Sequence, residues 1–187
     1  MYYFCRQDLF KSHGSIEISG HTAETGKFLW TAGHKFTETL GHQVLDLDPA
    51  YGENLVDFFD TTIPVMSDRL IEAFREVAVD NFELYPVTLR RIDNGVEYKN
   101  YKAINFIGCV DAIDMEKTKY EEDEDGIFDP EFDGPIILDQ RKVGGLKAFR
   151  LAVGPSLLVV NEQVGQHLIQ KNFKALLLQN TEKYKGI

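Results

Sequence analysis

The sequence predicts an α+β fold, with one domain over residues 1–187, a largely antiparallel sheet and two or more short helices packed on it. A chain of 187 residues can bury roughly 70% of its unfolded surface without disulfides or metals. Apolar residues make up 43% and aromatic residues 12%, as in globular cores. Short apolar runs bounded by turn formers alternate with two capped amphipathic patterns, which favours a mixture of strands and helices.

The first part of the chain contains the earliest strand signals. Strands are expected at Tyr2–Arg6 and Gln43–Leu47, and again at residues 55–59 and 63–66. Turn formers are frequent in residues 11–42 and hydrophobic periodicity is weak there, so no element is assigned to that stretch.

Ser67 marks the start of the clearest helix. A serine at this position accepts a hydrogen bond from a first-turn amide, and Leu70, Phe74, Val77 and Ala78 follow at helical spacing. A hairpin is expected next, because residues 82–92 and 96–110 are rich in β-forming side chains on either side of Asp93-Asn94-Gly95. Asn and Gly tolerate the positive φ that a tight turn needs.

A second capped helix is expected near the C-terminus. Asn161 is its predicted cap, with Val164, Leu168 and Ile169 on one buried face. A charged loop at residues 116–135 precedes this part of the chain. Further strands are expected at residues 136–139, 148–153, 157–160 and 173–179.

Two segments within the chain resemble each other. Residues 65–77 and 159–171 both run from a strand through a small polar cap into an amphipathic helix, and an Asn-Phe pair follows each of them. The similarity predicts a weak internal β-helix-β repeat. The alternative is that capped helices look alike in any protein, since two copies fall short of a solenoid.

Charge and cysteine content narrow the function classes. Thirty acidic residues against twenty basic ones give a net charge of −10, which repels nucleic acid and attracts basic partners. Cys5 and Cys109 lie in strand-like runs and are expected to be buried free thiols. Neither a signal-peptide pattern nor an apolar run of membrane length occurs, so a cytoplasmic protein without membrane contact is expected.

The spacing of potential metal ligands matches no established motif. His13, His21, His34 and His42 lie eight, thirteen and eight positions apart, without the close pairs of ligands that zinc sites use. Residues 121–132 begin like a calcium loop, but they start with glutamate and carry Phe132 where a bidentate glutamate belongs. We therefore expect no cofactor and no specific metal, while a weak cation site in this loop stays open.

No nucleophile elbow and no phosphate-binding loop occurs in the sequence, so we expect a binding protein and not an enzyme. Acid/base pairs need no local spacing, however. One alternative is therefore a small enzyme with a metal or acid/base site in the His-containing N-terminal segment. The other alternative is a structural or adaptor subunit of a larger assembly.

The charged loop provides the candidate binding surface. Its acidic residues are consecutive, repel one another and resist burial; they are Glu121, Glu122, Asp123, Glu124 and Asp125. Tyr120, Phe128 and Phe132 place apolar side chains beside that charge, a combination that suits a protein interface. The predicted partner-binding residues are Tyr120, 121–125 and Phe128. The alternative is a solvated loop that binds nothing.

From about Ile63 to Tyr184 the chain resembles the Imm11 immunity protein family of bacterial polymorphic toxin systems. The resemblance rests on the runs IPVMSDRLIEAF, FELYPVTL, YKNYKAINFIGCVDAID and KAFRLAVGPSLLVVNEQVGQHLIQKNF. Residues 61–187 therefore form the family-like part, and residues 1–60 a variable N-terminal part. Membership implies a cytoplasmic inhibitor that neutralises a cognate toxin by direct binding. It carries over no binding residues, so placing the acidic loop against a basic surface of the toxin rests on charge alone.

Overall fold

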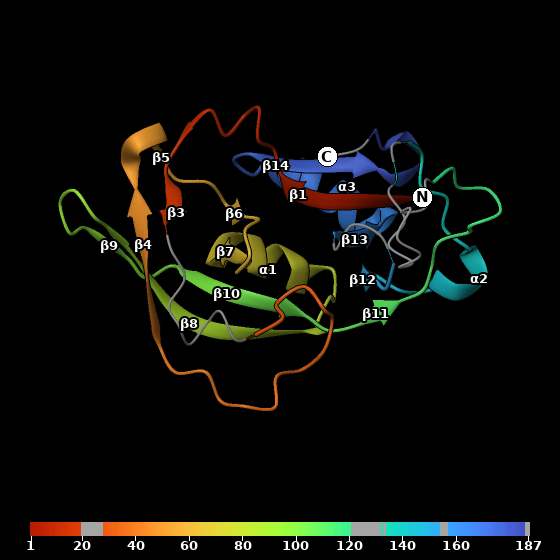
Figure 1. The fold of residues 1–187 in the computed structure, drawn as a ribbon, viewed down its shortest axis with the longest axis horizontal. Coiled ribbons are helices and arrows are strands. Elements are labelled where there is room, and N and C mark those ends of the chain that lie inside the picture. Colours follow the sequence, from red (N-terminus) through yellow and green to blue (C-terminus); the bar gives the residue numbers. More distant parts are fainter. Residues whose placement is uncertain (20–27, 121–131, 133, 154–156, 186–187) are drawn as a thin grey trace, which may run out of the picture.

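A computed structural model gives the fold (Figure 1) and describes residues 1–19, 28–120, 132, 134–153 and 157–185. The chain forms a single-domain α+β fold, so the predicted fold class is confirmed. Within the described residues the α-helices are α1 (Asp68–Glu76), α2 (Gln140–Val143) and α3 (Glu162–Lys171). Short 3₁₀ turns, η2 (Pro49–Tyr51) and η3 (Thr181–Lys183), follow two of the strands.

The described strands form two larger sheets and one small one. The first has the order β3-β4-β8-β10-β7-β6, with β9 beside β8. Its strands are β3 (Glu17–Ser19), β4 (Gln43–Asp48), β6 (Phe58–Phe59), β7 (Val65–Ser67), β8 (Phe82–Arg91), β9 (Glu97–Tyr98) and β10 (Tyr101–Phe106). The second has the order β11-β12-β13-β1-β14. Its strands are β11 (Cys109–Val110), β12 (Ala148–Leu151), β13 (Leu158–Asn161), β1 (Tyr2–Gln7) and β14 (Leu176–Asn180).

Most of the strand pairings are antiparallel, as expected. Among the described strands, eight of the eleven pairings are antiparallel, while β4–β8 and β11–β12 are parallel. The third parallel pair, β2 (Gly14–Ser15) with β5 (Gly52–Asn54), makes the small sheet. The division into two larger sheets was not predicted, because strand partners far apart in sequence leave no local signal.

The two larger sheets contain the same supersecondary unit. In the first, the hairpin β6–β7 leads into α1 and β8, and β10 lies between β7 and β8. In the second, the hairpin β12–β13 leads into α3 and β14, and β1 lies between β13 and β14. The middle strand follows its unit in one case and comes from the N-terminus in the other. The topology thus confirms the predicted internal β-helix-β repeat.

The two units correspond at a constant separation of 94 residues. Ser67 and Asn161 cap the two helices through their side-chain oxygens. Ala78 and Asn172 follow the helices with left-handed φ values of 54° and 51°. Asn172 is therefore equivalent to Ala78 and not to Asn81, so the Asn-Phe pairs noted in the sequence are not equivalent positions.

The middle strands also match. Tyr101 of β10 lies opposite the cap Ser67, and Tyr2 of β1 lies opposite the cap Asn161. Each tyrosine hydroxyl donates to a backbone carbonyl just before the hairpin of its own unit, at 3.0 Å for Tyr101 and 2.7 Å for Tyr2. The two units therefore share their arrangement of strands, helix and tyrosine contacts, while most of their other residues differ. This difference explains why the repeat gives only a weak signal in the sequence.

Three hydrophobic clusters hold the layers together. The first lies between the two larger sheets, where α1 and α3 contact each other, and it includes the fully buried Phe74 and the buried Leu168. Burial of one such side chain stabilises the fold by about 1.5–3 kcal/mol. The second cluster, around Trp30, covers the outer face of the first sheet, and the third, around Phe149, covers that of the second. Figure 1 shows α1 and α3 between β1–β14 and β8–β10.

Several expectations about the exposure of residues and the bounds of elements were wrong. Cys5 is buried, but Cys109 is exposed, because β11 is a two-residue strand at the end of its sheet. Ile169 lies 51% exposed and not on the buried face of α3. Residues 136–139 form an isolated bridge and no strand, and Ala78 lies beyond the end of α1.

Candidate functional site

The acidic segment comprises residues 121–133, and the described residues that flank it, 113–120 and 134–138, form its base. Of the predicted binding residues, the structure describes Tyr120, while residues 121–125 and Phe128 lie outside the described residues. The rings of Tyr120 and Phe132 lie 6.2 Å apart. Phe132 is only 6% exposed and belongs to the third hydrophobic cluster, so it is a core residue and not a surface anchor.

Hydrogen bonds join the two stretches of chain that form this base. The Thr118 hydroxyl accepts from the Ile137 amide at 3.0 Å, and the Asp114 amide donates to the Ile137 carbonyl at 2.8 Å. The bridge between Ile113 and Leu138 continues the contact. The described residues on the two sides of the acidic segment are therefore tied to each other.

Three of the cations near this base have acidic partners. Ion pairs join Lys117 to Asp114, Arg141 to Asp139 and Lys142 to Asp111. Hydrogen bonds from Arg141 lower the pKa of Asp139 to about 2. These pairs leave the three basic side chains largely neutralised before any charge of the acidic segment is considered.

Most of the net charge of the protein lies in the acidic segment itself. Residues 121–133 contain eight of the thirty acidic residues and none of the twenty basic ones. The remainder of the chain therefore carries a net charge of only −2, against −10 for the whole. A charge concentrated in this way creates a local field that attracts a basic surface.

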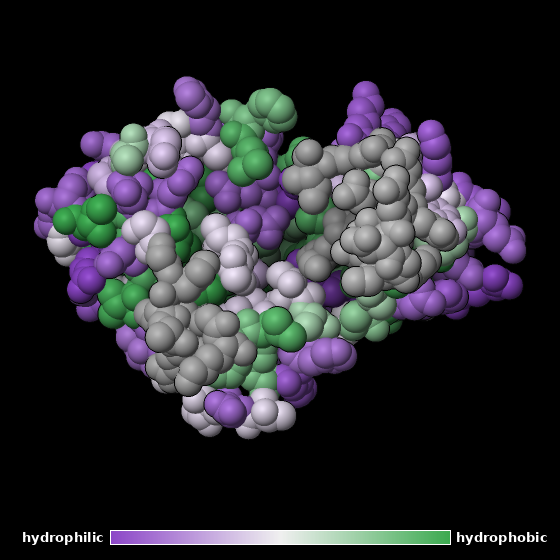
Figure 2. Space-filling view, in the orientation of Figure 1, coloured by the Kyte–Doolittle hydropathy of each residue, from purple (hydrophilic) through white to green (hydrophobic). Residues whose placement is uncertain are grey.

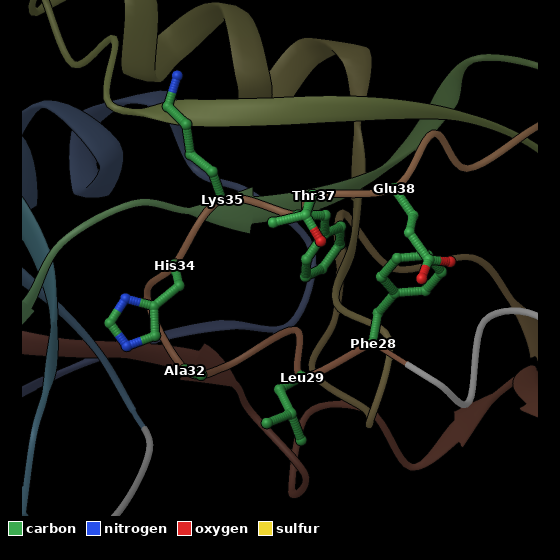
Figure 3. Close-up of a pocket in the computed structure, with 8 residues that line it drawn as sticks. Phe28, Leu29, Ala32, His34, Lys35, Thr37 and Glu38 are labelled. Carbon is green, nitrogen blue, oxygen red and sulfur yellow. The ribbon is translucent and has the colours of Figure 1, made fainter.

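A recess lies at residues 28–38, a stretch to which the sequence analysis assigned no element. It has a volume of about 290 Å³ and is lined by Phe28, Leu29, Ala32, His34, Lys35, Phe36, Thr37 and Glu38 (Figure 3). Beneath it, Trp30 is buried and packs against Phe36 and Tyr85 with ring centroids 5.0 and 5.3 Å away. This recess is large enough for one apolar side chain of a partner.

Two side chains at the recess, Lys35 and the neighbouring Tyr85, are engaged with Glu83. Figure 3 shows the Lys35 side chain extending away from Leu29 and His34, and its ammonium pairs with Glu83 at 3.3 Å. Burial, together with the hydrogen bond to Glu83, raises the pKa of Tyr85 to about 12, which keeps the Tyr85 hydroxyl protonated as a donor to that carboxylate. The only sequence signal for this cluster was its aromatic content.

The histidines considered as metal ligands are not brought together in the described part of the chain. His13, His34 and His42 are all exposed, and the His42 ring bonds the Thr88 hydroxyl at 3.0 Å. His21 lies outside the described residues. Within those residues, no group of three or more His, Cys, Asp or Glu side chains could hold a metal ion.

The comparison with protein-family models decides the assignment. Residues 6–183 match the model of the Imm11 immunity protein family. The chain belongs to the Imm11 immunity protein family. The match covers nearly the whole chain and extends into the first sixty residues, where the sequence resemblance found little.

The Imm11 assignment rests on this match. A comparison with curated proteins found no match. No helix in the described part of this Imm11 protein is long and apolar enough to cross a membrane. The family name indicates an immunity function; the surface that carries out that function is a separate question.

Proposed function

We propose that this chain neutralises a cognate bacterial toxin in the cytoplasm by direct non-covalent binding and catalyses no reaction. The match to the Imm11 immunity protein family carries the proposal. Residues Tyr120, 121–125 and Phe128 are proposed as part of the contact, with the acidic run facing a basic surface of the toxin. The concentration of eight acidic residues in residues 121–133 supports this placement.

The physical basis of the contact is long-range attraction followed by short-range packing. Opposite charges raise the rate of encounter, and the effect falls as salt shortens the screening length, about 8 Å at physiological ionic strength. Three cations near the base of the segment, Lys117, Arg141 and Lys142, are already paired with other carboxylates.

Association kinetics with the cognate toxin, sought first in a neighbouring gene, test the proposal. Reversing the charges of Glu122, Asp123 and Glu124 to lysine should slow association roughly tenfold at low salt and weaken its dependence on salt. A matched control reverses three exposed acidic residues elsewhere, Glu17, Glu72 and Glu97, and should change the rate much less. Failure of the wild-type protein to bind the toxin would reject neutralisation by binding. Equal rates for the two triple variants would remove the acidic run from the contact.

A further inference from the structure

β14 is an unprotected edge strand. It pairs with β1 on one side, and no described strand pairs with its other side. The strands at the other described ends of the two larger sheets, β3, β6 and β11, have only two or three residues, whereas β14 has five. Its sequence LLLQN contains no charge and no proline, the usual devices that prevent an edge from pairing with another chain.

The backbone of β14 presents hydrogen-bonding groups on that free side. The Asp8 amide donates to the Ala175 carbonyl at 2.8 Å, at the start of the β1–β14 ladder. Antiparallel ladders alternate between residues that bond the neighbouring strand and residues that face away. Because Ala175 bonds Asp8, the residue that follows β1, the backbone groups of Leu177 and Gln179 also point toward β1. The outward-facing groups are those of Leu176, Leu178 and Asn180.

Apolar side chains surround one end of this edge. Leu9 and Phe10 are 65% and 95% exposed in the loop that follows β1, and Ile169 of α3 is 51% exposed. A groove of about 270 Å³, lined partly by Ile169, Lys11 and residues 176–178, runs between them. The loop that follows β1 lies at the top of the view in Figure 1, and Figure 2 shows hydrophobic surface at the same place. Adjacent exposed apolar residues on this scale commonly mark an interaction site.

The other end of the edge contacts the chain that follows the acidic segment. The Ile136 amide donates to the carbonyl of Thr181, the residue that follows β14, at 2.9 Å. Ile136 lies three residues beyond the end of the acidic stretch 121–133. Residues that follow the acidic segment are therefore bonded to the chain just beyond the end of β14.

We propose that an extended segment of the toxin adds to β14 as a further antiparallel or parallel strand. Main-chain hydrogen bonds to β14 supply affinity, as in other cases of strand addition, while side chains supply specificity. The segment places apolar side chains against Leu9, Phe10 and Ile169. This inference rests on the proposed function and names the contact that carries it out.

Asn180 offers a matched pair of variants for the edge. Its φ of −54° suits proline, and its side chain accepts from the Glu182 amide at 2.8 Å. Asn180→Pro and Asn180→Ala both lose that side-chain bond, but only Asn180→Pro removes the outward amide. The proline variant should bind the toxin about tenfold more weakly than the alanine variant, as expected for one lost hydrogen bond. Equal affinities of the two variants would overturn strand addition.

The apolar end has its own pair of variants. Phe10→Ala should weaken binding tenfold or more, the effect of losing an interface anchor. Ile92→Ala, at a residue that is 54% exposed just after β8, should change affinity less than twofold. Because both residues are exposed, the far-UV circular dichroism of the variants should match the wild type. Unchanged binding by Phe10→Ala would remove this end from the contact.

The outcomes separate this inference from the proposed function. If the wild-type protein fails to bind the toxin, the proposed function fails. If the wild type binds but Asn180→Pro and Phe10→Ala bind equally well, only the β14 contact is rejected. Analytical ultracentrifugation of the protein alone adds a third outcome: a dimer that Asn180→Pro dissociates would mean that a second copy occupies β14, which also overturns the inference.

Discussion

Asp57 joins the two halves of the molecule through one buried carboxylate. It accepts hydrogen bonds from the Ser67 hydroxyl at 2.7 Å, the Arg69 guanidinium at 2.9 Å and the Lys174 amide at 2.8 Å. Arg69 also lies 4.3 Å from the centre of the Phe173 ring. The start of α1 is thereby tied to the loop that leads into β14, so the edge proposed to bind the toxin depends on this carboxylate.

Replacing Asp57 by asparagine should destabilise the protein by about 2 kcal/mol at pH 7, because charge-assisted hydrogen bonds are lost. Burial would raise the pKa of Asp57, but the bonds from Arg69, Ser67 and Lys174 outweigh burial and lower it. The stabilisation is therefore present above the unfolded pKa of about 3.9 and lost as the pH falls through the folded pKa. Urea unfolding at several pH values measures this.

The wild type and Asp57→Asn should accordingly converge in stability toward pH 2. Asp46→Asn, which breaks an exposed ion pair with Arg90, is the control and should cost less than 1 kcal/mol. A constant difference between wild type and Asp57→Asn from pH 7 to pH 2 would contradict the assignment of a charged Asp57 to the network.

At the scale of helices and strands, the sequence correctly predicted the features that depend on residues close together in the chain. The caps Ser67 and Asn161 and the turn at Asn94-Gly95 depend on neighbours in the chain, and the structure contains all three. The exposure of Cys109 and Ile169 depends on which strand or helix covers them. That information is tertiary, and no periodicity within one segment contains it.

Ala78 provides a test of the repeat at this scale. It is exposed and has a φ of 54°, at the position equivalent to the left-handed Asn172. An L-residue with a Cβ is disfavoured in this region, so Ala78→Gly should stabilise the protein by about 1 kcal/mol. Thermal or urea unfolding measures the change.

Glu72→Gly, at an exposed position inside α1, is the matched control. It should destabilise by about 1 kcal/mol, because glycine is unfavourable in a helix interior. Destabilisation by both glycine substitutions would show that Ala78 is not left-handed in solution and that the helix ends differ between the two units.

For the whole molecule, the sequence predicted the fold class and the acidic segment but only part of the surface. Tyr120 and the residues 121–133 stood out because charge runs are visible without a structure. Leu9, Phe10 and the free edge of β14 did not, because exposure and strand order emerge only when β1 is inserted between β13 and β14. Both outer faces of the larger sheets are covered by hydrophobic clusters, which leaves edges and loops for binding.

The most direct test of toxin neutralisation is growth of a bacterial host that expresses a candidate toxin from a neighbouring gene, with or without this protein. Co-expression of the wild-type chain should restore growth to the rate of cells without toxin. Arrested growth despite stable co-expression of both proteins would contradict the assignment of that toxin as the target of this immunity protein.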